Sequence, residues 1–216
     1  MTTPIKIVLG VLAVIILFVV GAAVAVIGAY NGLVGQDQGV SAAWAQVETS
    51  YQRRADLIPN LVATVAGAAN FEKSTLTEVT EARARVGQVT LPSGTVPTQA
   101  QINAFQQAQS GLGGALSRLL VVAEKYPDLK ASENFRDLQA QIEGTENRIA
   151  VARDRFNSAA QLYNTGLRTF PNVLYAGLFG FKERAYFAAA AGSETAPKVQ
   201  FDFNSNTNTA APAPVK

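Results

Sequence analysis

The stretch "ENFRDLQAQIEGTENRIAVARDRFNSAAQLYNTGLRTF", residues 133–170, carries the most regular pattern in this sequence. Apolar and small residues recur in steps of three and four, the spacing of one face of an α-helix. Ser132 is placed to cap this helix and Pro171 to end it, which gives roughly 58 Å of helix at about 1.5 Å per residue. The repeating positions are Phe135, Leu138, Ile142, Thr145, Ile149, Ala152, Phe156, Ala159, Tyr163, Gly166 and Phe170.

Three further segments, 30–69, 72–89 and 98–126, show the same spacing. Thr98 and Gln101 fit a capping box at the start of the third segment, and the proline at 127 disfavours helix at the residue before it. The first stripe is Val40, Trp44, Val47, Tyr51, Ile58, Val62 and Val65, with Ala55 filling the gap; the second is Leu76, Val79, Ala82, Val86 and Val89; the third is Ile102, Phe105, Ala108, Leu112, Leu116, Leu119, Ala123 and Tyr126.

Two long helices that frame two shorter ones predict an all-α fold, an elongated antiparallel four-helix bundle. No segment alternates with a period of two, so we expect no sheet. Residues 172–190 are rich in aromatics, and we expect a short helix or turn that folds back over one end of the bundle. Residues 191–216 are polar and contain prolines, which predicts a disordered tail.

Residues 7–29, "IVLGVLAVIILFVVGAAVAVIGA", contain no charged side chain. As a helix they would measure roughly 34 Å, enough to cross a hydrocarbon core of about 30 Å. A cleaved signal peptide would have a shorter apolar stretch and a more basic start, and a buried core helix is rarely uncharged over this length. The sequence therefore predicts a flank at 1–6, a transmembrane helix at 7–29, a bundle at 30–190 and the tail.

The charge around the span predicts its orientation. Lys6 precedes the span, whereas residues 30–52 contain no lysine or arginine. Cytoplasmic flanks are enriched in basic residues, so we expect the bundle to lie outside the cytoplasm. We predict the bacterial inner (cytoplasmic) membrane as the location, with the bundle on the periplasmic side.

The composition excludes several kinds of chemistry. The chain has no cysteine and no histidine, so it has no disulfide, no thiol nucleophile and none of the usual neutral-pH bases. With 18 basic and 16 acidic side chains its charge is nearly balanced, which does not favour nucleic acid binding. We expect no cofactor and no metal site.

Two local patterns could suggest catalysis, but packing explains them better. The glycine cluster in "SGLGGALSR", residues 110–118, follows no strand and lacks the Lys-Ser/Thr ending of a P-loop. Its glycines are expected to allow close helix contact or a kink. The glutamate pairs 78/81 and 143/146 lack the histidines of a di-iron bundle, so they are interpreted as solvated helix faces.

The stretch "SYQRRADLIPNLVATV", residues 50–65, places charges and a proline within the first stripe. We expect the helix to continue through the proline with a kink, because the proline removes one backbone hydrogen bond. Asp56 stands near Arg53 and Asn60 on the helix, and Asn60 is expected to find a partner across the bundle. These side chains either fix helix register or form a recognition patch; the candidate residues are Arg53, Arg54, Asp56, Pro59 and Asn60.

Several strings resemble the LemA family. They are "YNGLV" (30–34), "AW" (43–44), "VE" (47–48), "QRRADLIPNLV" (52–62) and "YPDLKASENFRDLQAQIEGTENRIAVARDRFN" (126–157), followed by "YN", "FP" and "GF" at 163, 170 and 180. The resemblance covers about residues 30–190. It implies a bacterial membrane-anchored helical bundle without a known enzymatic activity, and some relatives are associated with magnetosome membranes.

These observations favour a non-enzymatic scaffold or adaptor that acts through protein contacts in the bacterial cell envelope. The predicted partners are the membrane and an unidentified envelope protein, with a homo-oligomer also possible and no nucleic acid. One alternative is a self-assembling protein that organises membranes as homo-oligomeric arrays. Another, from a different class, is a carboxylate-based enzyme, for which the chain offers few suitable residues.

Overall fold

The computed structural model describes residues 3–68, 71–89, 91 and 95–188. Within these residues the chain forms helices and no strand, which agrees with the predicted all-α class. The elements are α1 (Thr3–Ala66), α2 (Lys73–Gln88), α3 (Gln99–Ala123), α4 (Pro127–Ala131), α5 (Glu133–Arg168) and the short 3₁₀ helix η1 (Asn172–Leu174).

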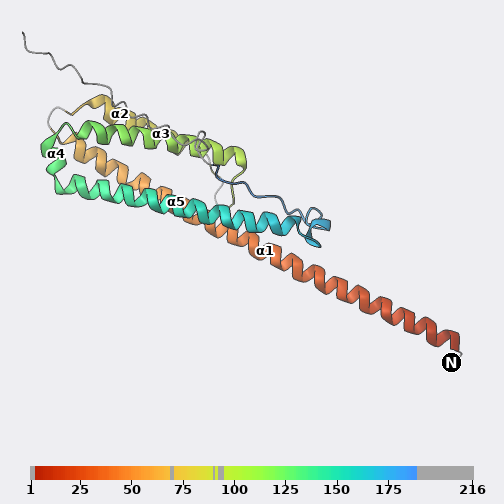
Figure 1. Ribbon diagram of the computed structural model, residues 1–216. Helices are drawn as coiled ribbons and strands as arrows, with labels where there is room; N and C mark the ends of the chain where they lie inside the picture. Colours follow the sequence, from red (N-terminus) through yellow and green to blue (C-terminus); the bar gives the residue numbers. More distant parts are fainter. Residues whose placement is uncertain (1–2, 69–70, 90, 92–94, 189–216) are drawn as a thin grey trace, which may run out of the picture.

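The second half of α1 forms a bundle with α2, α3 and α5, and successive long helices run in opposite directions (Figure 1). The most extensive packing joins α1 to α5, and α2 packs mainly on α3. The short helix α4 turns the chain between α3 and α5 at the end of the bundle far from the N-terminus (Figure 1). The elongated antiparallel bundle is therefore confirmed.

The first half of α1 projects from the bundle as a bare helix (Figure 1). The predicted transmembrane helix and the first bundle helix are one element, a single α-helix of 64 residues. Its apolar side chains outside the bundle are exposed, as at Leu17 and Phe18, because no other element covers them. This single long apolar helix near the N-terminus fits a membrane anchor.

The buried face of the bundle follows the predicted stripes with small shifts. On α1 the predicted stripe included Val62, but that residue is only half-buried. Its neighbour Leu61 is fully buried instead. On α5 the stripe ends at Leu167, because the helix stops at Arg168, and Phe170 is 75% exposed rather than buried. A stripe of three- and four-residue steps leaves such choices between neighbours open, and packing decides them.

The helix ends partly match the predictions. Thr98 and Gln101 form the predicted capping box, with the side chain of each residue bonded to the backbone N–H of the other. Ser132 is the first residue before α5, but its side chain makes no capping bond. The predicted break at residues 126–132 contains α4, which begins at Pro127, a position where the missing N–H of proline costs nothing.

Residues 181–188, here called the strap, run in an extended conformation back along the bundle. Side-chain amides hold the strap: Asn157 bonds both backbone groups of Phe187, and Gln99 bonds both of Tyr186. The Phe187 ring packs against those of Trp44 and Phe156, at centroid distances of 6.0 and 5.6 Å, and the three rings form one cluster. The segment folds back as predicted, but its last residues lie extended along the bundle. The predicted tail falls outside the described residues.

Candidate functional site

Polar side chains divide the core of the bundle into two apolar clusters. The cluster nearer the membrane anchor includes Trp44, Tyr51 and Phe156, and the far cluster includes Ile58 and Leu119. Between the two clusters, each of three helices contributes at least one polar residue to the bundle. We call this set the polar layer; it comprises Arg54 of α1, Gln109 of α3, and Thr145 and Glu146 of α5.

Arg54 is the centre of the polar layer and is only 5% exposed. Its Nη2 lies 2.8 Å from Oε1 of Glu146, which is about half exposed. A Cβ added to Gly113 of α3 would lie 3.4 Å from the same Nη2, an ordinary van der Waals distance. Gly111 and Gly114 have open space around their Cβ positions, so the structure does not show the close helix contact that was predicted for the glycine cluster. The Nε of Arg54 and the Oε1 of Gln109 are buried without a hydrogen-bond partner.

Burial changes the pKa values in the polar layer. Burial lowers the pKa of Arg54 below its usual value, and the charge of Glu146 opposes this change. Burial raises the pKa of the neighbouring Tyr51 phenol, while the positive charges of Arg153 and Arg54 oppose it. Both directions follow from the cost of holding a charge away from water. Arg54 is therefore a cation held in the core by one carboxylate.

The polar layer opens on one side into a groove of about 490 Å³ between α3 and α5. Glu143, Glu146 and Arg153 line this groove together with Arg54. Both carboxylates are already engaged, since Glu143 accepts a hydrogen bond from Gln139 and Glu146 pairs with Arg54. The groove therefore presents a balanced set of charges.

Arg53 points to a different surface from its neighbour Arg54. It is exposed and lines a groove of about 460 Å³ between α1 and α5, together with Arg148 and Arg155. We call this the arginine groove. Within the described residues none of these three arginines forms an ion pair, and no carboxylate lines the groove; Asp137 lines only the adjoining hollow. The arginine groove is thus a concave surface with uncompensated positive charge.

The other candidate residues are exposed. Asp56 accepts a hydrogen bond from Gln52 at 2.8 Å, and the described residues show no ion pair between Asp56 and Arg53. Asn60 faces solvent, so the predicted partner across the bundle is wrong. The reason is the helix phase, since the core face passes through Arg54, Ile58 and Leu61 and leaves both residues outside.

Pro59 lies within α1, which continues to Ala66 as predicted. A proline at this position cannot bond the Ala55 carbonyl, four residues earlier. Arg83 of α2 supplies the missing donor, because its Nε lies 3.4 Å from the Ala55 oxygen. The proline therefore leaves the Ala55 carbonyl free to accept a hydrogen bond from Arg83, and this bond joins α1 to α2.

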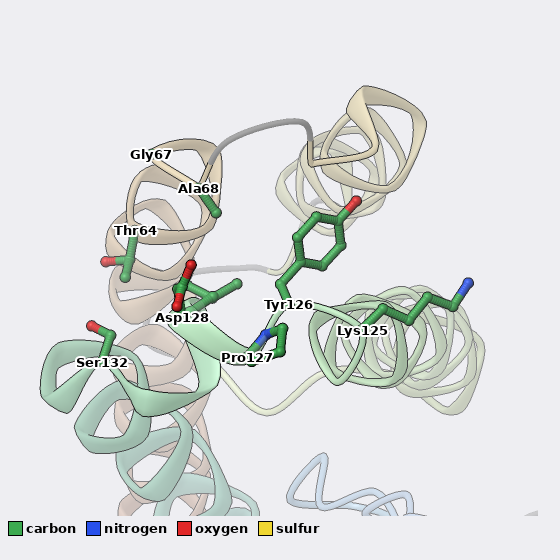
Figure 2. A pocket seen from close by; sticks show the side chains of 9 residues that line it. Thr64, Gly67, Ala68, Lys125, Tyr126, Pro127, Asp128 and Ser132 are labelled. Carbon is green, nitrogen blue, oxygen red and sulfur yellow. The ribbon is translucent and has the colours of Figure 1, made fainter.

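A third hollow lies where α1 ends near the α3–α4 turn (Figure 2). It measures about 400 Å³, and its charged lining residues are Lys125 and Asp128. Figure 2 shows the Lys125 amine pointing away from the Asp128 carboxylate, so the two charges do not converge on a ligand position. Among the described residues no group of three acidic side chains is placed to hold a metal ion.

The remaining glutamate pair lies on the surface of α2, as predicted. Glu78 forms an ion pair with Arg118 of α3, and Glu81 lies 3.7 Å from Arg85 one turn further along α2. Exposed pairs of this kind support helices weakly. Glu78 therefore has an ion-pair partner on the neighbouring helix, and Glu81 has one on its own helix.

Comparison with known proteins identifies the family of the chain. A model described as "LemA family" matches residues 43–201. This chain belongs to the LemA family. Magnetosome protein MamQ 2 of Paramagnetospirillum magneticum is 27% identical over 182 residues, which cover 77% of this chain and 67% of the relative. MamQ of Magnetospirillum gryphiswaldense is 26% identical with the same coverage. Protein LemA of Metamycoplasma hominis is 25% identical over 145 residues, 67% of this chain and 62% of its own length.

The sequence of this LemA family chain pointed to Arg53 and Arg54 but did not show that the two side chains line different grooves. Sequence reasoning also missed Gln109, because Ala108 fits the stripe equally well by spacing. Thr145 was the only one of the three buried residues of the polar layer that lay on a predicted stripe, because Ala55 and Ala108 stand on the predicted stripes in place of Arg54 and Gln109. Only the lengths of the turns and the pairing of the helices place these three residues at one level.

Proposed function

We propose that this protein is a non-enzymatic, membrane-anchored scaffold or adaptor that binds a partner protein in the cell envelope. The observation that carries the proposal is the unbroken helix α1, which joins the membrane anchor to the core of the bundle. A bundle carried on such a helix has a fixed position relative to its anchor. This suits a protein that presents a surface at a set distance from the membrane.

The arginine groove is the surface on which we place the partner. Arg53, Arg148 and Arg155 are exposed and carry charges that no described side chain neutralises. Arginines bind carboxylates with paired hydrogen bonds, and complementary charge speeds association and fixes orientation. The matching partner is a protein segment rich in aspartate and glutamate. The polar layer, in contrast, has the structural role of fixing helix register.

The proposed location is the inner membrane with the bundle on the periplasmic side. Its support is Lys6 before the span and the absence of basic residues from 30 to 52.

Photocrosslinking in intact cells tests the adaptor function. A photoreactive amino acid at Thr49 or Asn147, both in the arginine groove, should give a crosslinked product with a second protein. The double variant Arg53→Ala/Arg148→Ala should lose this product, and Arg136→Ala, an exposed arginine elsewhere on α5, should keep it. All variants should retain the wild-type Tm. A crosslink that persists in the double variant would show that the charges of Arg53 and Arg148 do not hold the partner.

The magnetosome proteins among the relatives favour a second candidate, a self-assembling protein that organises membranes. Size-exclusion chromatography with light scattering on the full chain in detergent separates the two. A single chain per particle supports the adaptor, whereas large homo-oligomers support the assembling protein. In the latter case the photocrosslinked product would have twice the mass of the chain.

A further inference from the structure

The turn between α5 and the strap exposes a cluster of large apolar side chains. Five residues of segment 170–179, here called the apolar loop, are 52 to 86% exposed: Phe170, Val173, Leu174, Leu178 and Phe179. No charged residue occurs between Arg168 and Lys182. Other large apolar side chains exposed on the described bundle are scattered, as at Val121 and Leu162. Clustered apolar exposure of this kind marks an interaction surface.

The apolar loop is an ordered structure that displays these side chains outward. Asn172 donates to the Gly166 carbonyl at 2.8 Å and accepts the Tyr175 hydroxyl at 2.6 Å. Tyr175 and Ala176 are buried beneath the turn, and Gly180 closes it with a positive φ of 78°. The exposed side chains are therefore held away from the core by fixed backbone geometry.

The position of the apolar loop relates it to the membrane anchor. The ring of Phe179 lies 5.2 Å from the ring of Tyr30, and that of Phe181 lies 5.5 Å from it. Tyr30 directly follows the apolar span 7–29 on the same continuous helix. Figure 1 shows the loop beside α1 at the end of the bundle from which the bare helix emerges. Tyrosine at the end of a span is typical of the membrane–water interface.

Charged residues border the apolar loop on both sides. Arg168 ends α5 and pairs with Glu183 at 2.7 Å, and Lys182 is exposed at the start of the strap. Apolar side chains bordered by lysine and arginine are the pattern of segments that lie in the headgroup region of a bilayer. Lys182 is placed to meet anionic lipid headgroups.

We propose that the apolar loop inserts into the interfacial region of the same bilayer that α1 crosses. A lone helix can tilt in a membrane, whereas a second contact beside it restricts both the tilt and the rotation of the bundle. The occupant is the lipid surface because the loop adjoins the anchor: the ring of Phe179 packs against that of Tyr30, the first residue beyond the span.

Spin labelling of the full chain in liposomes tests this inference. The chain has no cysteine, so a single cysteine at Leu178, which is 86% exposed, carries the nitroxide without further changes. Matched controls are Leu162→Cys on α5 and Val121→Cys near the far end of α3, 61% and 67% exposed. In liposomes of phosphatidylethanolamine and phosphatidylglycerol, collisions with oxygen relative to a water-soluble nickel complex should be severalfold more frequent at 178 than at either control.

Two outcomes would overturn the proposal. A label at 178 that is as accessible to nickel as the label at 121 would place the loop in water. Shielding from both reagents, with spin–spin broadening that disappears on dilution with unlabelled protein, would assign the loop to contact with a second copy. A label at Leu174 adds an independent variant: Leu178→Asp should move that label towards water, and both positions are exposed enough to leave folding unchanged.

Discussion

Arg54 and Glu146 join two helices through a charge that lies in the core. Arg54 is almost fully covered, while Glu146 is about half exposed, so the two partners differ in what they lose when separated. Removing the carboxylate leaves a buried cation without a counter-ion, whereas replacing the arginine by an apolar residue of similar length leaves no buried charge at all. The residue scale therefore predicts an asymmetry between the two substitutions.

Glu146→Ala should lower the free energy of unfolding by about 1 to 3 kcal/mol, reduced from the value for a fully buried pair by the exposure of Glu146. Arg54→Met should be close to neutral or stabilising. Arg53→Met is the control, because Arg53 is exposed, and it should change the stability by no more than about 0.5 kcal/mol. Urea unfolding of the detergent-solubilised chain, followed by circular dichroism, measures all three. A larger loss for Arg54→Met than for Glu146→Ala would refute this account.

At the scale of the elements, α5 packs tightly against α1 at Gly166. A Cβ added there would collide with the Gln36 side-chain oxygen and would lie 3.3 Å from a methyl carbon of Leu33. Gly144, on the same helix, has open space around the corresponding position. The two glycines have the same backbone role in a helix and differ only in their neighbours.

Overpacking against α1 should cost Gly166→Ala about 1 to 3 kcal/mol, and the gain of up to about 1 kcal/mol in helix propensity offsets only part of this loss. Gly144→Ala should stabilise the bundle by up to about 1 kcal/mol, because alanine has the higher helix propensity. Thermal melts of both variants provide the measurement. Adding Gln36→Ala should recover part of the loss at 166, and a stabilising Gly166→Ala would show that α1 and α5 can separate at little cost.

At the scale of the whole molecule, the continuous helix α1 contains the anchor and enters the bundle, and the apolar loop lies beside it between the two. The orientation of α1 in the membrane therefore decides on which side of the membrane the whole bundle lies. The basic residue before the span predicts the outer side.

Protease added to spheroplasts should therefore digest the bundle without lysis. A cytoplasmic marker protein that stays intact in the same sample is the control. Protection of the bundle until the cells are lysed would reverse the topology, and the acidic partner would then be sought in the cytosol.

The sequence by itself determined the four long helical segments and some of their ends. The three- and four-residue spacing, the capping box at Thr98 and the prolines at 127 and 171 act within a few residues of one another, so they can be read from a single chain. The apolar run at 7–29 likewise depends only on local composition. The family resemblance over about 30–190 is confirmed by the match over 43–201.

Only the tertiary structure decided which polar residues meet. Spacing after Tyr51 allowed Ala55 to fill the stripe, whereas the burial of Arg54 depends on its ion pair with Glu146 of α5. The strap shows no repeating pattern of apolar residues in the sequence. Its position depends on side-chain amides of α3 and α5 that bond its backbone. The apolar loop faces the anchor because α5 ends beside Tyr30. All three depend on contacts between segments far apart in sequence, whereas helical spacing records only which face of one helix is apolar.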